Sequence, residues 1–232
     1  MKAPRRVEAE WLDSLPADDR RAIGSRHDLK RLNLLMGHAA IIKRALERSW
    51  RHGKPRSILE IGAGDGTLML AVARRLVTRW HDVTVTLLDR QQLLSHRSEQ
   101  KFSALGWGVK SEAADVFDFL EQSPARFDVV VANLFLHHFS DEQLKTLFDR
   151  ISTMARLFVA AEPRRTGRAL LATRGLWMLG CNDVTRHDAV LSVRAGFTGS
   201  ELSKLWPGGQ EWELEERPAG VFSHGFAALR HG

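Results

Sequence analysis

The chain has 232 residues, 44% of them hydrophobic and 27% charged, which is usual for one globular α/β domain with modest additions. No apolar run reaches the roughly 20 residues of a membrane span. The amino-terminal segment has no secretory apolar core, and the single cysteine, Cys181, excludes internal disulfides and multi-cysteine zinc sites. These features together indicate a cytoplasmic protein. The net charge of +6 comes from arginines scattered among acids rather than from a basic block, so we expect no tight binding of nucleic acid.

The first predicted element is an amphipathic helical region over residues 7–50. Its apolar positions recur at spacings of three and four and form one helix face. They are Leu29, Leu32, Met36, Ala39, Ile42 and Leu46. Gly53 and Pro55 interrupt the pattern, so residues 1–52 are predicted to be a helical extension that covers the domain formed by residues 53–232.

Strands and helices alternate after this break. The strands are predicted at 57–61, 82–89, 108–115, 127–133 and 156–162. The helices are predicted at 67–80, 91–105 and, from a capping box at Ser140 and Gln143, up to Met154. Because these strands are apolar enough to be buried on both faces, the pattern predicts a doubly wound, parallel α/β sheet.

The carboxyl-terminal part departs from this alternation. Short helices are predicted around 188–194 and 200–205, inside an insertion at about 167–206 that would cover a site. Two further strands, 211–219 and 220–230, would form a closing hairpin.

Each of the first five predicted strands ends in or beside a polar residue. The carboxyl ends of the strands form the edge where a doubly wound sheet binds its ligand. The polar residues are the stretch Glu60–Gly66, Asp89, Asp115, Asn133 and Glu162. Capping of the following helices would explain some of them, for example Asp89 before a helix starting at Gln91, but does not easily explain all.

The glycine-rich stretch itself narrows the ligand. It has no lysine for a triphosphate loop, and Thr67 stands where a dinucleotide fingerprint needs its third glycine. Carboxylates at Glu60 and Asp65 would repel a pyrophosphate but attract a cation. The stretch therefore favours a cofactor that contains adenosine, lacks phosphate and carries positive charge.

At this point "LEIGAGDG" resembles the glycine motif of the class I S-adenosylmethionine-dependent methyltransferases, and "FDVVVANLFLHHF" resembles the fourth strand of their small-molecule branch, which includes ubiquinone/menaquinone-type and natural-product enzymes. The resemblance covers about residues 56–165. It implies a Rossmann-like, seven-stranded, mostly parallel sheet with an antiparallel last strand. It also implies a cofactor site made by Glu60, Gly62, Ala63, Gly64, Gly66, Asp89, Arg90, Asp115, Val116 and Asn133.

The residues that would act on the acceptor are less clearly marked. His138 and His187 are candidate general bases, because histidine titrates near neutrality. Candidate substrate contacts are His137, Glu162, Arg164 and Trp177. These candidates have structural alternatives. One of His137 and His138 could be a hydrogen-bonded histidine packed under the following helix, and His187 could be an ordinary surface histidine. Arg164 could be solvated at the start of a helix, and Trp177 could pack in the core.

The resemblance implies transfer of a methyl group from S-adenosylmethionine to oxygen or carbon of an aromatic or polyketide-like small molecule, without a metal ion. Two alternatives remain, an RNA methyltransferase and a non-catalytic protein that only binds the cofactor. The end of the fourth strand, "NLFLHH", differs from the Asn/Asp-Pro-Pro-aromatic pattern of enzymes that methylate base amines. The sequence does not distinguish a monomer from a homodimer.

Overall fold

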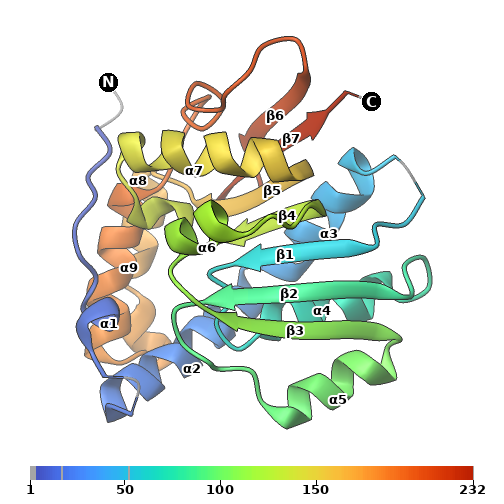
Figure 1. The fold of residues 1–232 in the computed structure, drawn as a ribbon. Helices are drawn as coiled ribbons and strands as arrows, with labels where there is room; N and C mark the ends of the chain where they lie inside the picture. The colour runs from blue at the N-terminus through green and yellow to red at the C-terminus, as the bar shows by residue number, and fades with distance from the viewer. Residues whose placement is uncertain (1–3, 17, 52, 232) are drawn as a thin grey trace.

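A computed structural model describes residues 4–16, 18–51 and 53–231. Its centre is a seven-stranded sheet in the order β3-β2-β1-β4-β5-β7-β6 (Figure 1). The strands are β1 (Ser57–Ile61), β2 (Val83–Asp89), β3 (Trp107–Ala113), β4 (Phe127–Asn133), β5 (Ala155–Pro163), β6 (Trp212–Pro218) and β7 (Ser223–Arg230). The strand β7 is antiparallel to both of its neighbours, whereas the others share one direction. The predicted fold class is therefore confirmed.

Helices cover both faces of the sheet and create two hydrophobic cores. One core joins α3 (His38–Ser49), α4 (Thr67–Leu76) and α5 (His96–Ala104) to one face, and the other joins α6 (Val116–Gln122) and α7 (Asp141–Met154) to the opposite face. Within β1, Ile58 belongs to the first core and Leu59 to the second, as the twofold periodicity of a strand requires. Burial on both faces explains why these strands read as continuous apolar runs.

The amino-terminal region is less regular than predicted. It forms α1 (Trp11–Ser14), α2 (Arg20–Leu35) and α3 instead of one long helix. Gly37, with a φ of 69°, separates α2 from α3 in a left-handed conformation that favours glycine. Residues 4–14, here called the strap, run along the edge formed by the carboxyl ends of the parallel strands (left side of Figure 1).

Two predicted boundaries near the cofactor motif were wrong. The helix expected from Gln91 begins at His96, because Ser95 caps it, so Asp89 is not a helix cap. The strand expected to end at Asp115 ends at Ala113, and Asp115 instead caps α6, which the sequence reading missed. The capping box of Ser140 and Gln143 is confirmed at the start of α7.

The predicted insertion contains α8 (Gly167–Thr173), the short 3-10 helix η2 (Leu176–Leu179) and α9 (Asp183–Ala195), whereas residues 200–205 form turns instead of a helix. We call residues 167–206 the cap. The helices α1, α2 and α8 all pack against α9, so the strap and the cap form one cover over the same edge of the sheet. None of the described helices is both long and apolar enough to span a membrane.

Candidate active site

The turn after β1 exposes bare backbone. Gly62, Gly64 and Gly66 have φ angles of 66°, 56° and 73°, in the region that favours glycine. A Cβ on Gly62 would lie 2.2 Å from the Phe135 ring, and a Cβ on Gly66 would lie 2.5 Å from the Leu87 side chain. Open space surrounds the corresponding position on Gly64. The turn thus needs glycine for its conformation, and Gly64 offers its main chain to a ligand.

Glu60 lies directly before this turn and is buried, with 2% of its surface exposed. Its Oε2 atom has no hydrogen-bond partner among the described residues. Burial raises the pKa of Glu60 well above its ordinary value, and the charges of Asp65 and Asp89 raise it further. A buried carboxyl group with an unused oxygen fits a ligand that brings positive charge.

Asp89, at the end of β2, faces the same turn. Its two oxygens accept hydrogen bonds from the Gly64 and Gln91 main-chain nitrogens, at 2.9 and 3.0 Å. Each carboxylate oxygen has a second lone pair, so the group can still accept from a diol. Of the other predicted adenosine contacts, Val116 is buried at the start of α6, and Arg90 is exposed and pairs with Asp13 of the strap at 3.4 Å.

Asn133, at the end of β4, is held by a residue that the sequence reading missed. His38 Nδ1 lies 2.5 Å from Asn133 Oδ1, and His38 Nε2 lies 3.1 Å from the Ser223 hydroxyl. Burial lowers the pKa of His38, so the neutral ring donates to Asn133 and accepts from Ser223. This orientation fixes the Asn133 amide oxygen and leaves its NH2 group to donate elsewhere. No local pattern in the sequence singles out His38.

Two predicted substrate contacts, Glu162 and His137, lie together in a buried network of hydrogen bonds and charges. Glu162 is fully buried and accepts hydrogen bonds from the main-chain nitrogens of residues 135, 136 and 137. Its Oε2 also lies 2.8 Å from His137 Nδ1, while His137 Nε2 faces Glu10 of the strap at 3.5 Å. Although burial lowers the pKa of His137, hydrogen bonds and charges from both carboxylates outweigh it and raise the pKa to about 9. His137 is therefore a buried imidazolium at neutral pH and cannot act as a base.

The two candidate bases differ in their surroundings. The His138 side chain is 26% exposed, and its Nδ1 lies 3.3 Å from Asp13. The His187 ring stacks on Trp11 with centroids 3.8 Å apart, and its Nδ1 lies 2.9 Å from Asp188. His138 follows β4 directly, whereas His187 lies on α9 within the cover. The geometry thus favours His138 over His187.

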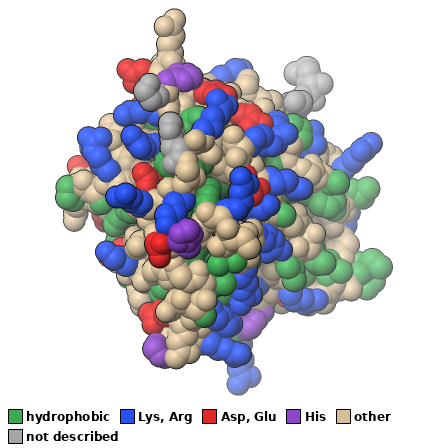
Figure 2. All heavy atoms as spheres, turned by 90° about the vertical axis from the view of Figure 1, so that its right-hand side faces the viewer, with side chains coloured by type: hydrophobic (Ala, Val, Ile, Leu, Met, Phe, Trp, Pro, Cys, Tyr) green, Lys and Arg blue, Asp and Glu red, His purple; other side chains and the backbone are tan. Residues whose placement is uncertain are grey.

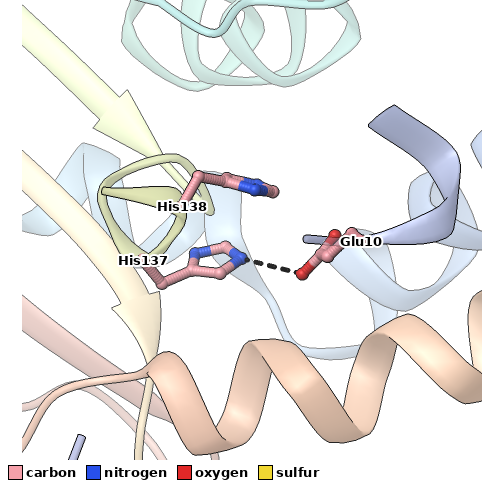
Figure 3. Close-up of side chains that lie close together, drawn as sticks. All are labelled: Glu10, His137 and His138. Carbon is pink, nitrogen blue, oxygen red and sulfur yellow. Dashed lines mark ion pairs between the residues drawn. The ribbon is translucent and has the colours of Figure 1, made fainter. Parts of the chain in front are cut away.

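Figure 3 shows His137 and His138 on their turn with Glu10 opposite them. Among the described residues these three form the set whose potential ligand atoms, all within 4.8 Å of one another, could hold a metal ion. A metal ion would have to displace the proton that His137 shares with Glu10. The observed pairing is complete without it, since the protonated ring faces one carboxylate at each nitrogen.

The last two predicted substrate contacts lie farther out. Arg164 is half-buried after β5, and its main chain bridges to Phe197 and bonds to Phe222. Trp177 lies on η2 with 64% of its surface exposed, so it is not a core residue.

The sheet order and the glycine turn next to Asp89 define the class of protein. Residues 58–156 match the model of a methyltransferase domain. The chain thus contains a methyltransferase domain and has the fold of the class I, S-adenosylmethionine-dependent enzymes. No curated protein sequence matches it significantly.

Solved structures agree on the fold at low sequence identity. The plantazolicin methyltransferase BpumL, solved with a substrate analogue and SAH, is 15% identical, with a TM-score of 0.66 over 95% of this chain and 93% of that one. A candidate O-methyltransferase from Nostoc punctiforme is 14% identical, with a TM-score of 0.62 over 96% of this chain. The present chain covers 64% of the Nostoc chain. The magnesium protoporphyrin IX methyltransferase of Synechocystis, solved with bound S-adenosylmethionine, is 12% identical, with a TM-score of 0.53 over 95% of this chain and 88% of that one.

The observed residues fit this cofactor. The open main chain at Gly64 admits the close approach of a ligand, the unused oxygen of Glu60 suits its positive charge, and Asp89 suits its ribose hydroxyls. When bound, S-adenosylmethionine supplies a methyl group that its sulfonium already activates.

Proposed function

We propose that this methyltransferase modifies oxygen or carbon of an apolar, aromatic or polyketide-like small molecule. The observation that carries the proposal is the position of His138. It lies on η1 (Leu136–His138), shortly after β4, where α9 of the cap packs against η1 and Asp13 of the strap lies 3.3 Å from the ring. A site between the strap and the cap suits a small acceptor better than a folded macromolecule.

The contacts described above support a proposed role for each residue of the site. Glu60, Asp89 and the glycine turn hold the cofactor, with Ala63, Arg90, Asp115, Val116 and Asn133 as further contacts, and His138 faces the acceptor. The chain then chiefly aligns the nucleophile with the methyl group. His138 accepts the proton of a phenol or enol, and the Asp13 carboxylate 3.3 Å away stabilises the resulting imidazolium. In the product, the methyl group takes the place of that proton on the acceptor atom.

The distribution of positive charge supports a small acceptor over RNA. Figure 2 shows the face at the amino ends of the parallel strands, where many Lys and Arg side chains gather. Residues that the topology places at this side include Arg51, Arg56, Arg79, Arg126 and Arg156. The carboxyl ends, with the glycine turn, lie on the opposite side of the sheet. RNA bound on the basic face would not reach the methyl group.

Calorimetric titration followed by a transfer assay tests the proposal. We expect S-adenosylmethionine to bind and NADH not to bind, and labelled methyl to appear on at least one member of a panel of phenols and enolic polyketides. Cofactor binding without transfer to any member of a broad panel would favour a non-catalytic role. Transfer to RNA in preference to the panel would overturn the small-molecule proposal.

A further inference from the structure

The cover carries an unusual surface on its outer side. Of the twelve large hydrophobic residues that are exposed in the described chain, six lie in two short segments. They are Leu34 and Leu35, at 74% and 68% exposure, and Leu171, Trp177, Met178 and Leu179, at 64%, 64%, 73% and 42%. Scattered exposed apolar residues are ordinary, but a concentration of this size indicates an interaction surface.

A direct contact joins the two segments. The Arg31 guanidinium donates to the Leu179 carbonyl oxygen at 2.8 Å, which brings the end of α2 against η2. Leu34 and Leu35 follow Arg31 by three and four positions, so they share its side of the helix. Leu171 lies on α8, shortly before η2 along the chain. We call Leu34, Leu35, Leu171 and Trp177–Leu179 the apolar rim.

The charges that the two segments of the apolar rim themselves carry are positive. No aspartate or glutamate occurs between Pro163 and Asn182, nor between Leu29 and Leu46, although Asp28 pairs with Arg31 at 3.5 Å and Asp183 follows the second segment. Arginines on α8 and just after it, Arg168 and Arg174, are exposed, and neither has an acidic partner among the described residues. A surface that combines bulky apolar side chains, a tryptophan and unpaired arginines is complementary to an anionic bilayer.

We infer that the apolar rim docks this enzyme on the surface of an anionic lipid bilayer. The leucines, Met178 and Trp177 would enter the boundary between headgroups and acyl chains, while Arg168 and Arg174 would contact the headgroups. Because η2 and α8 belong to the cover of the site, docking would place the cover of the acceptor site against the bilayer. The docking itself does not depend on the proposed reaction.

Vesicle co-sedimentation of the full chain tests the inference. We expect the protein to sediment with vesicles of phosphatidylcholine and phosphatidylglycerol, to sediment little with phosphatidylcholine alone, and to lose binding as salt is raised. The double substitution Trp177→Ser with Met178→Ser should weaken partitioning at least about tenfold. Arg168→Ser with Arg174→Ser should weaken it by about the same factor.

Matched controls separate docking from general stickiness. Val221→Ser with Phe222→Ser removes exposed apolar groups at the β6–β7 turn, and Arg74→Ser with Arg75→Ser removes exposed arginines from α4. Both should leave partitioning unchanged, and calorimetry should show unchanged cofactor binding in every variant. Equal losses in test and control pairs would overturn the inference, as would no binding to anionic vesicles. A wild-type mass of twice 26.2 kDa that Trp177→Ser with Met178→Ser halves would assign the apolar rim to self-association instead.

Discussion

The two sides of the active site are built on different principles. The side that we propose for the cofactor lies within residues 58–156, where the family model matches, and consists of strand ends and one glycine turn that are close in sequence. The side that we propose for the acceptor combines the strap, the turn after β4 and the cap, which lie far apart along the chain. Main-chain geometry defines the first side, and paired charged side chains define the second.

Arg5 illustrates how the acceptor side is assembled. Its guanidinium donates to the Ala195 and Phe139 carbonyl oxygens at 2.8 and 2.5 Å and pairs with Asp141 at 2.9 Å. It also lies over the Phe197 ring, at 4.5 Å from the ring centroid. One side chain thus joins the strap to two elements more than a hundred residues away. The comparison teaches that, in this protein, the proposed cofactor residues are set by local geometry, whereas the acceptor side depends on pairing between distant parts of the chain.

Among the substitutions that distinguish the two sides, we expect His138→Ala to have the largest effect. It should lower the turnover number by about 10²–10⁴-fold, because it removes the proposed general base, and should leave cofactor affinity unchanged. His187→Ala should have a smaller effect, since that ring is already engaged with Trp11 and Asp188. Turnover against pH, with His96→Ala as an exposed control, measures the difference. Wild-type rates for both variants between about pH 6 and 9 would show that catalysis here depends on positioning alone.

The paired charges of the acceptor side should make stability depend on pH. The pKa of His137 is raised from 6.5 to about 9, so its stabilisation is complete below pH 6.5 and is lost as the pH rises through 9. The loss should approach about 3 kcal/mol of unfolding free energy. Denaturant unfolding from pH 6 to 10 should show this decline in the wild type and a flatter profile in His137→Gln. A decline of equal size in His137→Gln and the exposed control His96→Gln would assign it to other groups.

Asp89→Ala tests the cofactor side alone. Loss of the hydrogen bonds to the ribose hydroxyls should weaken S-adenosylmethionine binding by roughly 1.5–3 kcal/mol, the range for charge-assisted bonds. Asp82→Ala, at the other end of β2, is the matched control and should bind normally. If a folded Asp89→Ala protein kept wild-type affinity in calorimetry, the ribose would have to lie elsewhere.

The smallest effect concerns Glu60. Because a cationic ligand favours the ionised carboxylate, binding should release the proton that burial retains, so affinity should rise with pH. We expect a change of about tenfold, or ~1.4 kcal/mol, across the titration of Glu60. Glu60→Gln should bind with little pH dependence. An equally steep profile in Glu60→Gln would place the titrating group outside this side of the site.

The sequence alone determined most of the sheet and of the cofactor side. The apolar runs of β1, β2 and β4 and the capping box of α7 are local signals, and local signals predict elements well. The glycines, Asp89 and Glu60 could be found because a ligand at the carboxyl edge needs those residue types at fixed spacings. The two boundaries that failed depended on which polar residue caps a helix, since Ser95 rather than Asp89 caps α5 and Asp115 caps α6 instead of ending a strand.

Only the tertiary structure decided the roles on the acceptor side. Whether His137 is free to contact an acceptor or is a buried imidazolium depends on Glu10, which lies more than a hundred residues earlier, and on Glu162. The link from His38 to Asn133 spans 95 positions, and Arg31 reaches Leu179 across 148 positions. No periodicity or spacing encodes such pairs, because they form only when packing removes water and brings distant polar groups together. The two carboxylates that packing brings to His137 then raise its pKa to about 9.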